Sequence, residues 1–254
     1  MRNKLGIHDM ESEISMPKIT SGYDIEKDAW NRRCAMNAFT NWRWYETMDQ
    51  EDQYMLSKIK WLWQEEANKI LFPYLDKKYQ NNRKYVDEVV EQLKDNLDMQ
   101  KDVIFDYIER LTKHPILRKD FTIWFTTCKR WPYNWTTWEI WMCDPPKKER
   151  RNRNWNYLFA HELLHMQTHK YYEKEFPMNQ LNKQQFNLIK ESLTFLLNYE
   201  FPWVNMAIDR WYPQHQEFRK ILENYRLSCW DKKDFEELIN FGCNYILENN
   251  LLSE

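Results

Sequence analysis

The sequence predicts an α+β fold that is predominantly α-helical, with a small antiparallel β-hairpin next to a helix that carries a metal-binding motif. Apolar residues recur at helical spacing over most of the chain. Only 3 glycines stand against 14 Trp, 15 Tyr and 13 Phe in 254 residues, which favours bulky packing between helices over tight glycine turns. One stretch, residues 121–143, is instead rich in Thr, Ile, Phe and Trp, a composition typical of strands.

The first half of the chain is expected to supply a helical scaffold. Residues 1–22 are polar and aperiodic, so we expect a flexible N-terminal arm followed by a single helix-rich domain over residues 23–254. Residues 24–75 show helical spacing with a break near Asp49. Residues 85–113 form a longer amphipathic pattern that ends before a His-Pro pair, which predicts one long helix beside the site.

The strand-like stretch is expected to form the hairpin. Its two segments, 121–129 and 134–143, are joined by a short turn, which predicts antiparallel pairing. We expect the sheet either to pack on helices or to offer an edge to which an extended peptide adds as a strand. Two further helices are expected C-terminal to residue 201, one of them containing the segment WYPQHQ.

The motif that carries chemistry is His161-Glu162-Leu163-Leu164-His165, on a helix expected to run to about residue 173. Residues four apart on a helix lie on one face about one turn apart, so both imidazoles can reach one Zn²⁺ ion. Glu162 is then angled toward a water molecule on that ion. The sequence has six histidines in all, which makes a chance H-E-x-x-H uncommon.

A catalytic zinc site needs a third protein ligand, and Glu191 is the leading candidate. It lies within an apolar helix expected over residues 182–201, and coordination would offset the cost of burying its carboxylate. The alternative is a glutamate exposed on the outer face, as the charged neighbour Lys190 suggests. His169 is the rival ligand, but it lies about 12 Å along the helix from His161, too far for one tetrahedral site. Other candidate ligands are Glu173, Glu175 and Glu200.

This donor set predicts hydrolysis of a peptide or amide bond. Zinc lowers the pKa of a bound water toward about 7, Glu162 accepts its proton, and the water attacks the substrate carbonyl. The oxyanion that forms needs a further donor. Tyr212 and His215 of the WYPQHQ segment are the preferred candidates and Tyr199 is another, with packing or surface hydrogen bonding as the alternative role for each.

At these residues the chain resembles the zincin metallopeptidases, and specifically the gluzincins, over roughly residues 124–201, within an expected catalytic core of about residues 120–201. The resemblance implies that His161, His165 and Glu191 bind one zinc ion and that Glu162 is the general base. Ser192 and Leu193 match the small and apolar residues that often follow the liganding glutamate, whereas Phe195 replaces an aspartate of thermolysin-like members. The segment FAHELLHMQTH is also similar to the ImmA/IrrE family of cytoplasmic zincins, with Leu164 at the usual glycine position.

Composition bounds the location and the partners. With 37 Lys+Arg against 39 Asp+Glu, the net charge of −2 gives no overall field for nucleic acid or an anionic membrane. No apolar run is long enough for a leader or a membrane span, so we expect a soluble cytoplasmic protein. Five cysteines without a C-x-x-C pair fit reduced thiols; Cys128 and Cys143 could face one another across the expected hairpin, but we expect them to be buried and reduced.

The sequence therefore predicts a cytoplasmic, zinc-dependent peptidase that acts on a peptide or protein substrate. The first alternative is a non-catalytic interaction protein in which the zinc site is structural or vestigial. The second is a protein that binds single-stranded nucleic acid through the basic run 147–153 and the side chains of Trp131, Trp135 and Trp155. Neutral overall charge argues against nucleic acid as a partner.

Overall fold

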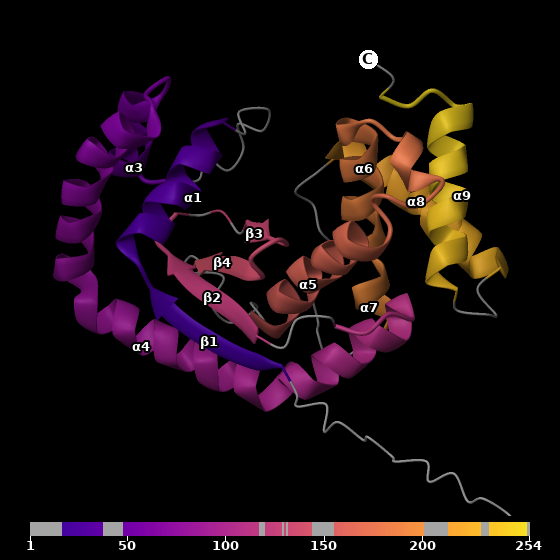
Figure 1. Ribbon diagram of the computed structural model, residues 1–254, viewed down its shortest axis with the longest axis horizontal. Coiled ribbons are helices and arrows are strands. Elements are labelled where there is room, and N and C mark those ends of the chain that lie inside the picture. The colour runs from indigo at the N-terminus through magenta and orange to yellow at the C-terminus, as the bar shows by residue number, and fades with distance from the viewer. Residues whose placement is uncertain are drawn as a thin grey trace, which may run out of the picture.

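The computed structural model describes residues 17–37, 48–116, 120–128, 130, 132–143, 155–200, 213–229 and 234–252. These residues form many helices around one small mixed sheet, which confirms the predicted α+β, mostly helical fold (Figure 1). The helices are α1 (Ile25–Asn37), α3 (Gln50–Ile59), α4 (Gln64–Thr112), α5 (Trp155–Tyr171), α6 (Lys183–Leu193), α7 (Leu196–Glu200), α8 (Pro213–Cys229) and α9 (Phe235–Glu248), with a short 3₁₀ helix at Met178–Gln180. The strands are β1 (Lys18–Tyr23), β2 (Asp120–Thr126), β3 (Tyr133–Asn134) and β4 (Glu139–Cys143).

Helix α4 is longer than the sequence pattern indicates, because the end of the first helical region and the predicted helix 85–113 join into one element. It contains Pro73 and has a non-helical backbone at Asn82, where the side-chain amide donates to the carbonyl of Lys78. The predicted break at Asp49 is confirmed, since Asp49 caps α3 by accepting from the backbone N–H of Asp52. Figure 1 shows α4 curving around the sheet, and it contacts α1, β1, α5 and α9.

The predicted antiparallel hairpin is wrong. The strand order is β1-β2-β4-β3, and β2 pairs with β4 in parallel, with Ile123 opposite Ile140 and Phe125 opposite Met142. The chain does reverse within this stretch, but it does so between β3 and β4, which pair antiparallel through a turn that ends at Trp138 in the left-handed region. Strand composition alone does not distinguish these pairings, because the same apolar side chains are buried in both.

Part of the predicted N-terminal arm is also wrong, because residues 18–22 belong to strand β1. This strand pairs in parallel with β2 along its whole length and buries Ile19. Its other residues are mostly polar, so its sequence carries little sign of a strand, and the pairing partner supplies the order. Residues 1–16 lie outside the described part of the chain.

The helices that carry the motif meet in one large hydrophobic core. Helix α5 contributes Phe159, Leu163 and Leu164, and α6 contributes Ile189 and Leu193, all fully buried in the same cluster. Helix α5 also contacts β3 and α7. The helix expected over 182–201 is divided into α6 and α7, and the two C-terminal helices α8 and α9 are present as predicted.

Two expectations from the composition concern features outside the site. Among the described helices, none combines the length and apolar character that crossing a membrane requires. The thiols of Cys128, Cys143 and Cys243 are buried and that of Cys34 is half-buried, and these four cysteines form no disulfide bond among the described residues.

A buried charged network ties α1, α3 and α4 together. The guanidinium of Arg32 is fully buried and donates to Asp52 at 2.7 Å, and Asp28 lies at 4.0 Å. Asp52 also accepts from Tyr74 at 2.5 Å and from Lys78 at 2.8 Å. Burial alone would raise the pKa of Asp52, but the charges of Arg32 and Lys78 and these hydrogen bonds outweigh it and lower the pKa.

We expect Asp52→Asn to destabilise the protein by about 1–3 kcal/mol at pH 7, since Arg32 keeps only Asp28 as a carboxylate partner. A carboxyl whose pKa is lowered by folding stabilises the protein above its unfolded pKa of about 3.9 and loses that contribution as the pH falls through the folded pKa. Urea unfolding of both proteins between pH 7 and pH 2 measures the difference, which should shrink below about pH 4. A difference that is constant over this range would contradict the assignment.

Candidate metal centre

The three predicted ligands lie together. Nitrogen atoms of His161 and His165 and a carboxylate oxygen of Glu191 all lie within 4.8 Å of one another. Glu191 Oε2 is 3.3 Å from Nε2 of His165 and 3.9 Å from Nε2 of His161. Within the described ranges this is the one group of three or more His, Cys, Asp or Glu side chains close enough to share a metal ion.

Local sequence explains how each ligand is held. Helix α5 is buried over most of its circumference, so its motif lies inside the protein instead of on a surface face. Helix α6 begins at a capping box, in which Asn182 accepts from the backbone of Gln185 and the Gln185 side chain accepts from that of Asn182. Ile189 and Leu193 anchor α6 in the core, and Glu191 lies on the side facing the two histidines.

His165 is in the form that binds metals. Burial lowers the pKa of its imidazole to about 3, despite the opposing charge of Glu191, so the ring is neutral near pH 7. Among the described residues, neither ring nitrogen has a partner in a well-aligned hydrogen bond, although Nε2 faces Glu191. A buried polar nitrogen without such a partner is uncommon, and a metal ion would satisfy it.

Glu191 places a negative charge beside the two histidines. Burial alone would raise the pKa of its carboxyl, but His165, Lys190 and His161 together hold that pKa well below its usual value. Ligand atoms around a tetrahedral zinc ion, each about 2.0–2.2 Å from the metal, are roughly 3.3 Å apart. The measured separations of 3.3 and 3.9 Å are therefore close to those of a coordination sphere, and two imidazoles with one carboxylate suit zinc.

Glu162 lies at the same centre. Its side chain is buried on α5 between the two histidine positions, and its charge helps to raise the pKa of Tyr133. Burial contributes most to that rise, which brings the pKa of the Tyr133 hydroxyl to about 12 even though Lys190 opposes it. Glu162 and Tyr133 are therefore electrostatic neighbours within the centre.

The other predicted site residues are not in the metal group. His215 lies near the start of α8, and Tyr212 lies outside the described residues. Tyr199 is on α7, where its exposed ring lies against Phe195 and the guanidinium of Arg226. Glu173 is half-buried and pairs with His169, Glu175 is solvent-exposed, and the Glu200 side chain lies outside the described part of the chain.

His169 is part of a separate set of contacts beside the ligands. Its Nε2 is 2.8 Å from the hydroxyl of Tyr133, and its Nδ1 is 2.9 Å from Glu173. Trp135 stacks on its ring, so this tryptophan, proposed above as a nucleic-acid platform, is engaged within the protein. Trp155 packs against the hydrophobic core, and the remaining parts of that proposed surface, Trp131 and residues 147–153, are not among the described residues.

Sequence reasoning missed Lys190 and Tyr133 at this centre. The charge of Lys190 supported only the alternative of an exposed Glu191, whereas Lys190 itself is only 6% exposed. The signal was present, because Lys190 follows Phe186 by four residues and precedes Leu193 by three, which places it on the apolar stripe of the helix. Tyr133 gave no such signal, since it lies in the segment taken as a hairpin turn.

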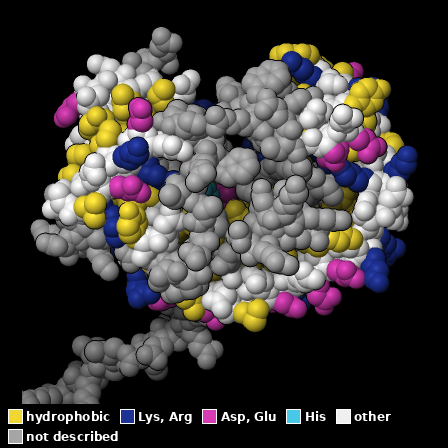
Figure 2. Space-filling view, turned by 180° about the vertical axis from the view of Figure 1, so that it is seen from behind, with side chains coloured by type: hydrophobic (Ala, Val, Ile, Leu, Met, Phe, Trp, Pro, Cys, Tyr) yellow, Lys and Arg dark blue, Asp and Glu magenta, His cyan; other side chains and the backbone are white. Residues whose placement is uncertain are grey.

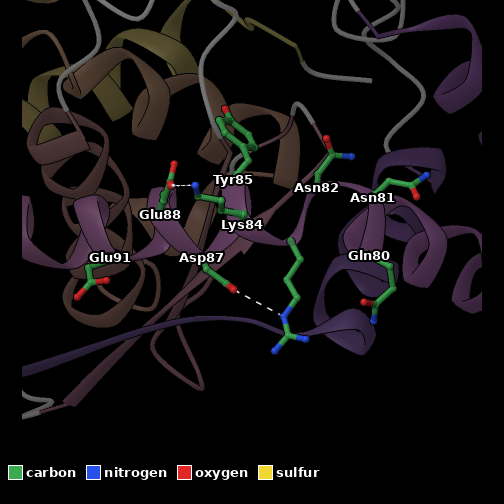
Figure 3. Close-up of a pocket in the computed structure, with 9 residues that line it drawn as sticks. Gln80, Asn81, Asn82, Lys84, Tyr85, Asp87, Glu88 and Glu91 are labelled. Atoms are coloured by element: carbon green, nitrogen blue, oxygen red, sulfur yellow. Dashed lines mark ion pairs between the residues drawn. The ribbon is translucent and has the colours of Figure 1, made fainter.

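A pocket near the bend in α4 is distinct from this centre. It is lined by nine residues between Gln80 and Glu91, none of them a candidate ligand (Figure 3). Two ion pairs run along the helix there, Arg83–Asp87 at 3.8 Å and Lys84–Glu88 at 3.9 Å. Acidic and basic side chains also lie along the lower right edge of the space-filling view (Figure 2). Exposed ion pairs between residues four apart are common on helix surfaces, so these pairs do not indicate a binding site.

The resemblance to zincins depends on residues within the span 124–201. Comparison of the chain with protein-family models, with curated proteins and with solved structures gives no match. The function therefore has to be argued from the donor set and the geometry of the candidate metal centre.

Proposed function

We propose that the protein is a zinc-dependent peptidase or amide hydrolase. The observation that carries the proposal is the convergence of His161 and His165 from α5 with Glu191 from α6, within 4.8 Å. Two imidazoles and one ionised carboxylate leave a fourth position open on a tetrahedral ion, as catalytic zinc sites do. The side chains of His161, His165 and Glu191 are only 14%, 2% and 18% exposed, so charges at this position interact more strongly than they would in water.

Each residue has a distinct role in this proposal. When bound, zinc supplies a Lewis acid that polarises a carbonyl and makes water acidic near neutral pH. His161 and His165 would bind the metal through their Nε2 atoms. The carboxylate of Glu191 would bind as the third ligand and reduce the net positive charge of the metal centre. Glu162, beside His161, accepts a proton from the attacking water and delivers it to the leaving nitrogen.

The proposed substrate is a peptide or a protein. Strand β3 lies at one end of the described sheet order and contacts α5, so a peptide bound at that edge in extended form would lie beside the metal centre. A cytoplasmic location belongs to the same proposal, because Cys34, Cys128, Cys143 and Cys243 form no disulfide bond among the described residues, as reduced thiols in a reducing compartment would not.

Metal content tests the proposal directly. Wild-type protein reconstituted with zinc and dialysed is expected to retain about one zinc per chain by elemental analysis, and to cleave members of a peptide library. His161→Ala should lose most of the zinc, whereas His215→Ala should retain it, because His215 lies outside the metal group. A chelator should remove the cleavage activity and added zinc should restore it.

Three outcomes would count against parts of this proposal. Wild-type protein without zinc after reconstitution would contradict the metal centre itself. Zinc retained in His161→Ala would contradict the ligand set. Zinc bound at one per chain, with no cleavage of any peptide or small amide, would favour the non-catalytic protein with a structural zinc site.

A further inference from the structure

A buried lysine lies directly behind the third ligand. The Lys190 side chain is 7% exposed, and its ammonium lies 3.2 Å from Glu191 Oε1. It donates a hydrogen bond to the hydroxyl of Tyr133 at 2.8 Å and lies 5.0 Å from the centre of the Tyr133 ring. A buried ammonium is costly unless it is paired, and here a carboxylate, a hydroxyl and an aromatic face share its charge.

The Tyr133 hydroxyl connects this lysine to helix α5. An ammonium only donates, so the tyrosine oxygen accepts from Lys190. The Glu173 carboxylate only accepts, so Nδ1 of His169 donates to it at 2.9 Å, and Nε2 of the neutral ring accepts from the Tyr133 hydroxyl at 2.8 Å. The hydrogen-bonded series thus runs from α6, through the edge strand β3, to the helix that carries the two histidine ligands.

The two oxygens of Glu191 face different partners. Oε1 faces Lys190, whereas Oε2 faces Nε2 of His165 at 3.3 Å and Nε2 of His161 at 3.9 Å. A glutamate side chain has several rotatable bonds, and fixing it costs conformational entropy. Contacts that hold the carboxylate before the metal arrives reduce that cost on binding.

We propose that Lys190, held by Tyr133 and His169, is a positioning residue that keeps Oε1 of Glu191 away from the metal and presents Oε2 alone. This inference rests on the proposed zinc site and adds the way its third ligand is oriented. Partners of this kind behind metal ligands contribute strongly to metal affinity. The same lysine could instead weaken metal binding, because its positive charge repels a divalent cation nearby. The sign of the change in affinity therefore tests the inference.

The test is the zinc dissociation constant, measured by competition with a chromophoric chelator. Lys190→Met and, separately, Tyr133→Phe are expected to weaken zinc binding about 10- to 100-fold. Lys190→Arg keeps the positive charge and should recover part of the loss. Lys183→Met removes an exposed lysine from the first turn of the same helix and serves as the matched control, with unchanged affinity.

A second readout reports on the geometry. In protein loaded with cobalt in place of zinc, the visible absorption of Lys190→Met and Tyr133→Phe should change, because a released carboxylate can bind through both oxygens and raise the coordination number. A merely structural role for Lys190 would lower the stability of the apo protein and leave this spectrum as in wild type. Tyr133→Phe retains the ring and is the variant to use if Lys190→Met does not fold.

The outcomes separate this inference from the proposed function. Wild-type protein that binds no zinc would overturn both. Wild-type protein that binds zinc, with equal or tighter binding in Lys190→Met and in Tyr133→Phe, would overturn the positioning role alone. Tighter binding would identify the lysine as a competitor of the metal for Glu191.

Discussion

Replacing Glu162 with glutamine is expected to leave zinc binding intact and to lower kcat/KM for a cleaved peptide by about 10²- to 10⁴-fold. Glutamine has nearly the same shape as glutamate and fits the same buried position, but it does not accept a proton from water. Steady-state kinetics on a peptide found by library cleavage, with elemental analysis of the same samples, measures both quantities.

Glu175→Gln is the control for this substitution, because Glu175 is a solvent-exposed glutamate that follows α5 and lies outside the metal group. It should keep both the zinc and the activity of the wild-type protein. Glu162→Gln with wild-type activity and wild-type zinc would remove Glu162 from the reaction. Loss of zinc from Glu162→Gln would instead mean that this residue contributes to binding the metal.

Replacing Glu191 with alanine is expected to have two large effects, loss of most of the zinc and destabilisation of the apo protein. The second effect follows from Lys190, whose buried ammonium would lose its carboxylate partner. Removing one member of a buried pair costs about 3–5 kcal/mol. Urea unfolding in the presence of a chelator measures this loss without any contribution from the metal.

A double-mutant cycle isolates the pair. The chain with both Glu191→Ala and Lys190→Met has no buried charge left unpaired at these two positions, so it should be more stable than Glu191→Ala alone. The two single variants and the double variant, compared with wild type, give the coupling free energy of Lys190 and Glu191. An apo Glu191→Ala protein as stable as wild type would show that the pair contributes nothing to the fold.

Much of the fold was predictable where a signal is local. Apolar residues at helical spacing identify the helices, and Asp49 begins α3 because its side chain caps a backbone N–H. The pairing of strands was not predictable in this way. It depends on which segments meet in space. The sequence therefore predicts an arm where β1 pairs with β2, and an antiparallel hairpin where β2 pairs in parallel with β4.

The candidate site likewise has features that local sequence predicts and features that only tertiary contacts decide. The sequence by itself determined that His161 and His165 share one face of a helix, because their spacing matches the helical period, and it pointed to Glu191 as a carboxylate in an apolar helix. Only the tertiary structure decided that Glu191 faces both histidines, and that Lys190 is buried against Tyr133. Helical period is a property of neighbours along the chain, whereas the contact between Lys190 and Tyr133 joins residues 57 apart and exists only once α6 packs near the sheet edge.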